Sequence, residues 1–142
     1  MNIAFFLVPK SDVAFLYDDH TLRQGLEKMK HHGYTAIPVI NHEGKYLNTI
    51  SEGDFLWHIL KDDKEGEEGD LLQKPMQSLE SSCIRDLLHE DKNPPVPITA
   101  TPERLLTRAL EQNFIPVIDD AGSFIGIVTR RDVLKYFSES ID

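Results

Sequence analysis

Four consecutive residues near the carboxyl end carry the most distinctive chemistry of this sequence: Thr129, Arg130, Arg131 and Asp132. They follow an apolar run and precede apolar residues at helical spacing, which predicts a junction between a strand and a helix. The N–H groups and the dipole at a helix start favour phosphate, and the two arginines add fixed positive charge. The Asp132 carboxylate can accept two hydrogen bonds from a ribose diol. These residue types are therefore compatible with a nucleotide site.

The same residues are also typical of a helix cap, in which Thr129 caps the helix and the carboxylate three residues later reaches back to a backbone N–H. The two interpretations are compatible, because Thr129 can cap the helix while Asp132 faces a ligand. A second Ser/Thr-x-x-Asp motif occupies residues 51–54, where a glutamate and a glycine replace both arginines. It keeps Asp54 for a ribose, but we expect it to bind phosphate poorly.

The two motifs belong to an internal repeat. When the chain is shifted by 78 residues, residues 37–56 fall on residues 115–134, and seven of the twenty positions are identical. Chance would give about one or two identities for typical residue usage. The sequence therefore predicts two copies of one unit.

Hydrophobic periodicity and turn residues give each copy the order β-α-β-β-α. In the first copy we expect strands at residues 13–16, 34–40 and 45–50, a helix that begins at Asp18 or Asp19 and ends at Gly33, and a helix that begins at Ser51. In the second copy we expect strands at residues 96–99, 115–118 and 124–128, a helix from Thr101, about a turn shorter than its counterpart, and a helix from Thr129. The expected boundaries are 1–60 for repeat 1, 61–80 for an acidic linker and connecting helix, and 81–142 for repeat 2.

Composition narrows the function classes. The chain has 142 residues, with 15 basic residues against 24 acidic ones, which gives a net charge of −9. This acidity argues against nucleic-acid binding, which needs a basic face. The longest apolar run, residues 3–8, is too short to span a membrane and lacks the features of a signal peptide. We therefore expect a cytoplasmic protein that binds neither nucleic acid nor membrane.

Catalytic and metal-binding patterns are missing from the sequence. The single cysteine, Cys83, excludes a disulfide within the chain and a cysteine-based zinc site, and we expect it to be a small buried apolar residue. The six histidines show no ligand spacing and are expected at the surface. No nucleophile–base pattern, phosphate-binding loop or dinucleotide fingerprint occurs. We therefore expect no catalysis, no metal and no cofactor.

The repeated unit resembles the CBS domain. The likeness rests on residues 115–119, Gly122 and residues 126–132 in the second copy, and on residues 37–40, Gly44 and residues 51–54 in the first. The first copy departs from the family at Asn48, where glycine is usual. The resemblance implies an α+β fold in which two β-α-β-β-α CBS repeats pack as one pseudo-twofold module with two clefts. Residues 12–14, 34–38 and 129–131 are also similar to stand-alone bacterial CBS pairs that bind cyclic di-AMP.

The resemblance implies a ligand-binding set in each cleft. The main cleft would use Pro9, Asp12, Val13, Ala14, Tyr34, Thr35, Ala36, Ile127, Thr129, Arg130, Arg131 and Asp132. Adenine would lie against the backbone near Ala14 and Ala36, and Tyr34 would either stack on the ring or serve as a core strand residue. The second, weaker cleft would use Ser51, Asp54, Val96, Asn113 and Phe114.

The leading functional hypothesis is a non-enzymatic regulatory module that binds an adenine nucleotide (AMP, ADP or ATP) between the repeats and modulates an unknown partner protein. One alternative is a cyclic di-AMP receptor that uses the same cleft. Another is a structural dimerisation module without a ligand. We also expect a homodimer, formed through apolar residues of the two motif-bearing helices: Leu56, Ile59, Leu60, Val133, Leu134 and Phe137.

Overall fold

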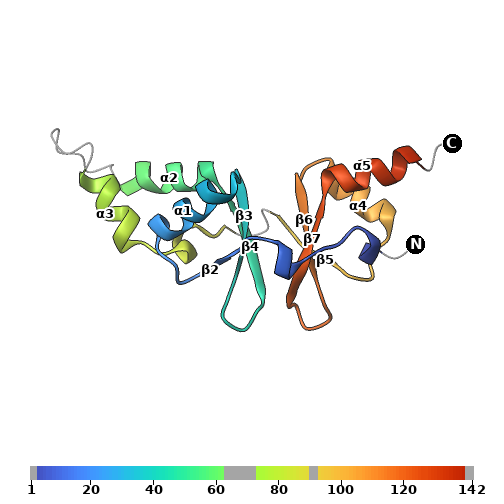
Figure 1. The fold of residues 1–142 in the computed structure, drawn as a ribbon. Coiled ribbons are helices and arrows are strands. Elements are labelled where there is room, and N and C mark those ends of the chain that lie inside the picture. Colours follow the sequence, from blue (N-terminus) through green and yellow to red (C-terminus); the bar gives the residue numbers. More distant parts are fainter. Residues whose placement is uncertain (1–2, 63–72, 90–92, 140–142) are drawn as a thin grey trace. The chain divides into compact units, whose positions relative to one another are not determined.

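The computed structural model describes residues 3–62, 73–89 and 93–139 (Figure 1). The chain divides into two compact units. The Asp132 unit comprises residues 1–13, 43–46 and 91–142, and the Asp54 unit comprises residues 14–42 and 47–90. Each unit combines one sheet with helices, which confirms the predicted α+β class. Most of the predicted acidic linker, residues 63–72, lies outside the described residues.

The Asp54 unit contains a three-stranded sheet of order β2-β3-β4. Its strands are β2 (Leu16–Tyr17), β3 (Ala36–Ile40) and β4 (Tyr46–Ser51), and its helices are α1 (Leu22–His32), α2 (Glu52–Asp62), α3 (Gln73–Ser81) and the short 3-10 helix η3 (Ile84–Leu87). Strand β2 runs parallel to β3. Its apolar core collects the buried residues of these elements: Leu16, Leu22, Met29, Ile37, Val39, Ile50, Phe55, Ile84 and Leu87.

The start of helix α1 differs from the sequence prediction. Thr21, rather than Asp18 or Asp19, is the N-cap, and it forms a capping box with Gln24. The Thr21 hydroxyl accepts from the Gln24 N–H at 3.1 Å, and the Gln24 side chain accepts from the Thr21 N–H at 2.8 Å. The helix ends as predicted at Gly33, whose φ of 69° suits a residue without a side chain.

Strand β4 begins one residue later than predicted, and strands β2 and β3 begin later by three and two residues. The strand expected at residues 13–16 is β2, Leu16–Tyr17, because Val13 closes the preceding 3-10 turn by donating its N–H to the Lys10 carbonyl. Strand β3 begins at Ala36 rather than at Tyr34, because the Tyr34 N–H still bonds to the Met29 carbonyl of α1.

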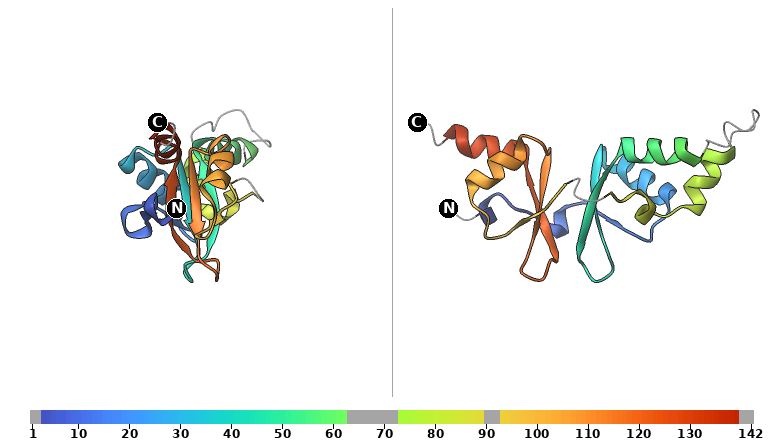
Figure 2. Two further views of the ribbon diagram at one scale, coloured as in Figure 1. Left: turned by 90° about the vertical axis from the view of Figure 1, so that its right-hand side faces the viewer. Right: turned by 180° about the vertical axis from the view of Figure 1, so that it is seen from behind.

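The Asp132 unit contains a four-stranded sheet of order β1-β7-β6-β5. Its strands are β1 (Val8–Pro9), β5 (Val96–Pro97), β6 (Phe114–Ile118) and β7 (Phe124–Thr129), and its helices are α4 (Pro102–Ala109), α5 (Arg130–Glu139) and the 3-10 turns η1 (Ile3–Phe5) and η2 (Lys10–Asp12). Figures 1 and 2 show α4 and α5 on the same face of this sheet. Helix α4 has 8 residues against 11 in α1, which confirms the predicted shortening.

The amino-terminal segment completes the sheet of the second repeat. Strand β1 pairs antiparallel with β7, so that Pro9 lies opposite Gly126. A Cβ atom at position 126 would lie 2.2 Å from the Val8 carbonyl oxygen, closer than any side chain tolerates. Glycine is therefore required at position 126, where β1 pairs with β7.

The corresponding residue of the first repeat, Asn48, makes a different use of this position. It is buried, and its side-chain Nδ2 donates to the His89 carbonyl oxygen while its Oδ1 accepts from the Thr49 N–H. The departure from the family's glycine thus has a structural cause, because the amide holds the segment that leads into the second repeat.

The turn between β3 and β4 belongs to the Asp132 unit. The Phe124 N–H donates to the Gly44 carbonyl at 2.8 Å, and the Tyr46 N–H donates to the Gly122 carbonyl at 3.2 Å. The Tyr46 hydroxyl also donates to the Asn93 carbonyl at 2.7 Å. These bonds join the hairpin turns of the two repeats within one compact unit.

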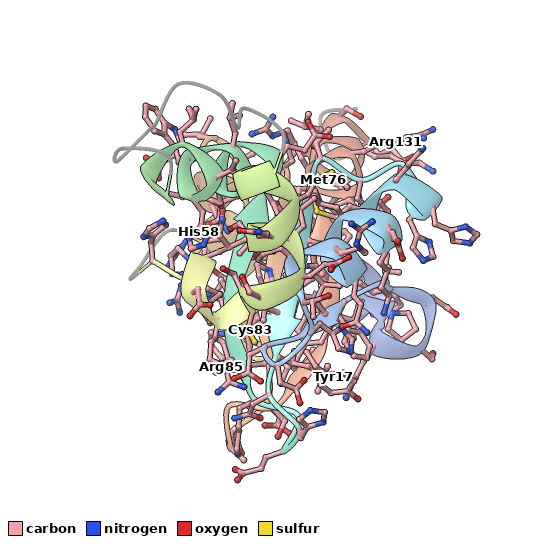
Figure 3. The ribbon with its side chains drawn as sticks, turned by 90° about the vertical axis from the view of Figure 1, so that its left-hand side faces the viewer. Tyr17, His58, Met76, Cys83, Arg85 and Arg131 are labelled. Carbon is pink, nitrogen blue, oxygen red and sulfur yellow. The ribbon has the colours of Figure 1, made fainter. Side chains whose placement is uncertain are left out.

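Three further expectations can be compared with the structure. Cys83 is half-buried rather than fully buried, because it occupies the N-cap of η3, where its N–H donates to Asp86 (Figure 3). Of the residues expected in a dimer interface, Val133 is instead in the core of the Asp132 unit. In the described ranges, no helix is both long enough and apolar enough to cross a membrane.

Candidate functional site

The Thr129–Asp132 motif lies where β7 meets α5, as the sequence predicts. Thr129 is the last residue of β7, opposite Phe114 of β6, and its hydroxyl accepts from the Asp132 N–H at 3.2 Å. The Arg130 N–H donates to the Asn113 carbonyl at 2.9 Å. Among the described residues, the Arg131 N–H is therefore the donor in the first turn of α5 that remains for a ligand.

The Asp132 carboxylate is available for hydrogen bonding. Its side chain is half-exposed, and no N–H or O–H group in the described ranges donates to it. Only its backbone takes part in the cap, so the carboxylate does not reach back to the strand. The structure thus confirms the predicted cap by the Thr129 hydroxyl but not the predicted return bond from the Asp132 carboxylate, and the carboxylate that is left over is compatible with the binding interpretation.

The matching carboxylate of the first repeat is in a different state. Asp54 is 7% exposed, and its Oδ2 accepts from the Ser51 N–H at 2.7 Å and from the Ser51 hydroxyl at 3.1 Å. Here the carboxylate itself caps the start of α2. Each motif therefore forms one of the two bonds of a capping box: in the second repeat the hydroxyl accepts from the aspartate N–H, and in the first repeat the aspartate carboxylate accepts from the serine N–H. This difference does not follow from the shared sequence pattern.

The two arginines also differ. Arg130 Nε donates to the Ala109 carbonyl at 2.7 Å, at the end of α4, where a cation interacts favourably with the helix dipole. Arg131 is exposed, and Figure 3 shows its side chain pointing outward. Arg131 therefore presents both an unbonded backbone N–H and a solvent-accessible guanidinium, whereas Arg130 also holds the unit together.

The amino-terminal residues predicted for the main site lie beside β7 in the same unit. Val8 pairs with Ile127 and Pro9 with Gly126, and η2 then carries Asp12, which is exposed. Val13 is 7% exposed. The structure thus brings the amino-terminal part of the predicted set onto the strand that ends at Thr129.

The remaining predicted residues are divided between the units. Those in the Asp54 unit are Ala14, Tyr34, Thr35, Ala36, Ser51 and Asp54, and those in the Asp132 unit are Val96, Asn113 and Phe114. Thr35 accepts from the Glu52 N–H at 3.0 Å, so the residues before β3 meet the start of α2. In the same way Asn113 accepts from Arg130, which is the equivalent contact in the second repeat.

A histidine–aspartate hydrogen bond that sequence reasoning missed involves His42. Its Nε2 lies 2.7 Å from Asp19 Oδ2, and its ring stacks on Tyr17 with centroids 4.4 Å apart. The hydrogen bond from His42 lowers the pKa of Asp19. Asp and His at these positions are 23 residues apart, so no local spacing signals the pair.

Metal binding finds no support in the described ranges. Within residues 3–62, 73–89 and 93–139, no group of three or more His, Cys, Asp or Glu side chains is arranged to hold a metal ion. Of the six histidines expected at the surface, His31, His32, His42 and His89 are exposed, whereas His20 and His58 are half-buried.

The chain belongs to the CBS domain family. The family model matches it twice, at residues 7–61 and at residues 84–139. This confirms the resemblance and the two-repeat organisation inferred from the 78-residue shift. Each match ends with the helix that follows one Ser/Thr-x-x-Asp motif.

Similar proteins include chains of about this length and a much longer enzyme. The crystal structure of CbpB in complex with c-di-AMP is 26% identical, with a TM-score of 0.83, and the alignment covers 98% of this chain and 85% of that one. CBSX2 in complex with AMP is 21% identical, with a TM-score of 0.73 and coverage of 99% and 98%, a likeness of fold alone. The A-adding tRNA nucleotidyltransferase of Aquifex aeolicus (strain VF5) is 29% identical over 129 residues, which span 90% of this chain and 14% of that enzyme.

Proposed function

We propose that this protein is a non-enzymatic regulatory module that binds an adenine nucleotide at the Thr129–Asp132 motif and thereby changes its affinity for a partner protein. The observation that carries the proposal is the pairing of an unbonded Asp132 carboxylate with the Arg131 N–H and guanidinium at one helix start. A ribose needs acceptors for its hydroxyls, and a phosphate needs donors and positive charge. The motif offers both.

Cyclic di-AMP is the adenine nucleotide to test first. CbpB, which is 26% identical over 98% of this chain, has been crystallised with c-di-AMP. A cyclic dinucleotide brings two phosphates, which suits the exposed Arg131. AMP and ATP remain the alternative ligands, because the Asp132 carboxylate is suited to a 2′,3′-diol, and cyclic di-AMP has no such diol.

The two classes of ligand would therefore form different numbers of hydrogen bonds with the Asp132 carboxylate. With AMP, the carboxylate would accept from two ribose hydroxyls, and with cyclic di-AMP from a single 2′-hydroxyl. Replacing Asp132 by alanine should then weaken the binding of AMP more than that of cyclic di-AMP. Replacing Arg131 should weaken the binding of cyclic di-AMP at least as much as that of AMP.

Isothermal titration of the wild-type protein with AMP, ATP and cyclic di-AMP tests the proposal. A ligand present at 100 times its Kd also raises the free energy of unfolding by about 2.7 kcal/mol, which a melting curve detects. If none of the three nucleotides gives heat or a shifted melting curve, the proposal is wrong and the structural dimerisation module becomes the better hypothesis.

We also propose that the protein forms a homodimer through the motif-bearing helices. Leu56 and Leu60 of α2 and Leu134 of α5 are 59%, 50% and 53% exposed, and an exposed apolar patch on a helix can serve as an interaction surface. Light scattering should give twice the monomer mass, and the double variant Leu56→Lys/Leu60→Lys should return the monomer mass. A wild-type monomer at high concentration would contradict this.

A further inference from the structure

An open hollow lies within the Asp54 unit, between the last turn of α1 and the first residue of α2. Its volume is about 420 Å³, and it is lined by Leu26, Met29, Lys30, Gly33, Tyr34 and Glu52. Small-molecule sites commonly occupy volumes of about 300–1,000 Å³. The hollow is therefore large enough for a ligand of amino-acid size.

The apolar part of the hollow is anchored to the core. Met29 is 2% exposed, and Leu26 and Tyr34 pack against the same core cluster. The Tyr34 ring also lies 5.5 Å from the ring of His32. At Gly33 a Cβ atom would meet nothing within 4 Å, so the space beside that residue is empty. The hollow thus combines a fixed apolar wall with an open side.

The other repeat shows what is missing here. Arg130 is the counterpart of Glu52, and its Nε donates to the Ala109 carbonyl in the last turn of α4. A glutamate has only acceptors when ionised, so Glu52 cannot make the equivalent bond to the last turn of α1. The last turn of α1 carries Lys30, but it has no counterpart of the guanidinium bond that Arg130 makes to a main-chain carbonyl at the carboxyl end of α4, where a cation interacts favourably with the helix dipole.

We propose that this hollow binds an α-amino acid with a large apolar side chain. The ammonium group would pair with the Glu52 carboxylate, the apolar side chain would lie on Met29 and Tyr34, and the carboxylate would interact with Lys30. Glu52 and Lys30 form no ion pair with each other or with any other described residue. The hollow shares Tyr34 with the residues that the resemblance assigns to the main cleft, but it includes no residue of the Thr129–Asp132 motif, so its test remains distinguishable from that of the proposed function.

Three probes separate the contributions of the two charges: L-phenylalanine, 2-phenylethylamine without the carboxylate, and 3-phenylpropanoate without the ammonium group. Lys30→Gln should weaken the binding of phenylalanine and phenylpropanoate about three- to tenfold in Kd and leave the binding of the amine unchanged. This range lies between the contribution of an exposed ion pair and that of a hydrogen bond to a charged group. Glu52→Gln should weaken phenylalanine by a similar factor and remove binding of the amine. Titration calorimetry gives the affinities.

Two exposed charged residues outside the hollow provide matched controls. Glu27 of α1 and Lys135 of α5 are exposed and do not line the hollow, so Glu27→Gln and Lys135→Gln should leave all three affinities unchanged. Amide spectra should show the Gly33 and Tyr34 signals moving on addition of phenylalanine. The proposal is overturned if phenylalanine gives no such shift at about 20 mM, a concentration that detects even millimolar affinity. It is also overturned if the amine binds as tightly as phenylalanine, or if the control variants weaken binding as much as Lys30→Gln and Glu52→Gln.

Discussion

Because Asp54 is hydrogen-bonded within the fold and Asp132 is not, replacing Asp54 should mainly lower stability, and replacing Asp132 should mainly weaken nucleotide binding. Asp54→Ala removes two hydrogen bonds from a side chain that is 7% exposed. A loss of this kind costs about 1–3 kcal/mol of unfolding free energy, and at about 4 °C per kcal/mol the melting temperature should fall by about 4–12 °C. Asp132→Ala removes no hydrogen bond within the described residues, so only its favourable interaction with the helix start is lost, about 0.3–1 kcal/mol.

Nucleotide binding should respond in the opposite order. Asp132→Ala removes hydrogen bonds between a charged acceptor and the ribose, worth about 1.5–3 kcal/mol, which is about 10- to 150-fold in Kd. Asp54→Ala should change the Kd by less than about threefold, because Asp54 is already bonded to Ser51 and Glu52 beside it repels phosphate.

The assay combines melting curves with titration calorimetry at 20 °C on the wild type, Asp54→Ala, Asp132→Ala and a control, Asp120→Ala. Asp120 is exposed in the β6–β7 turn of the Asp132 unit, so the control removes one negative charge without touching either motif. Equal losses of affinity in the two motif variants would refute the reasoning from carboxylate availability. A melting temperature that falls as far in Asp132→Ala as in Asp54→Ala would show that Asp132 also has a bonded, structural role.

Three other predictions follow from single contacts. Gly126→Ala should lower the melting temperature by more than 10 °C, because its Cβ would lie 2.2 Å from the Val8 oxygen and β1 must separate from β7, at a cost of about 3 kcal/mol or more; an unchanged melting curve would contradict this. Asp19→Asn should lower the melting temperature near pH 5.5, because the His42 hydrogen bond lowers the pKa of Asp19 and so stabilises the fold above the ordinary carboxyl pKa of about 3.9. The difference in melting temperature between wild type and Asp19→Asn should vanish as the pH falls through the lowered pKa. An undiminished difference at pH 2 would contradict this prediction. Arg131→Ala should weaken ATP more than AMP and AMP more than adenosine, and the loss should shrink at high salt, since screening acts on the exposed guanidinium; equal losses for all three ligands would exclude a phosphate contact.

Much of the fold and of the candidate site could be predicted from local sequence patterns. The 78-residue repeat, the β-α-β-β-α order, the shorter α4 and the position of Thr129 at a strand–helix junction all depend on residues that are close in sequence. Periodicity, glycine turns and capping residues act over a few positions, so each can be recognised without knowing the rest of the chain. The Ser/Thr-x-x-Asp motifs are likewise visible in the sequence, together with the chemistry that their side chains could perform.

The tertiary structure decided how those local options are used. Whether an aspartate bonds to its own cap, as Asp54 does, or remains available, as Asp132 does, depends on the backbone and burial around it. Arg130 bonds to Ala109, which is 21 residues away, and β1 pairs with β7 across more than a hundred residues. Such contacts form between segments that only folding brings together, and their geometry selects one of several hydrogen bonds that each side chain could make. The sequence by itself therefore determined the repeat and the chemistry that each motif can offer, while only the folded chain determined which carboxylate and which arginine are left for a ligand.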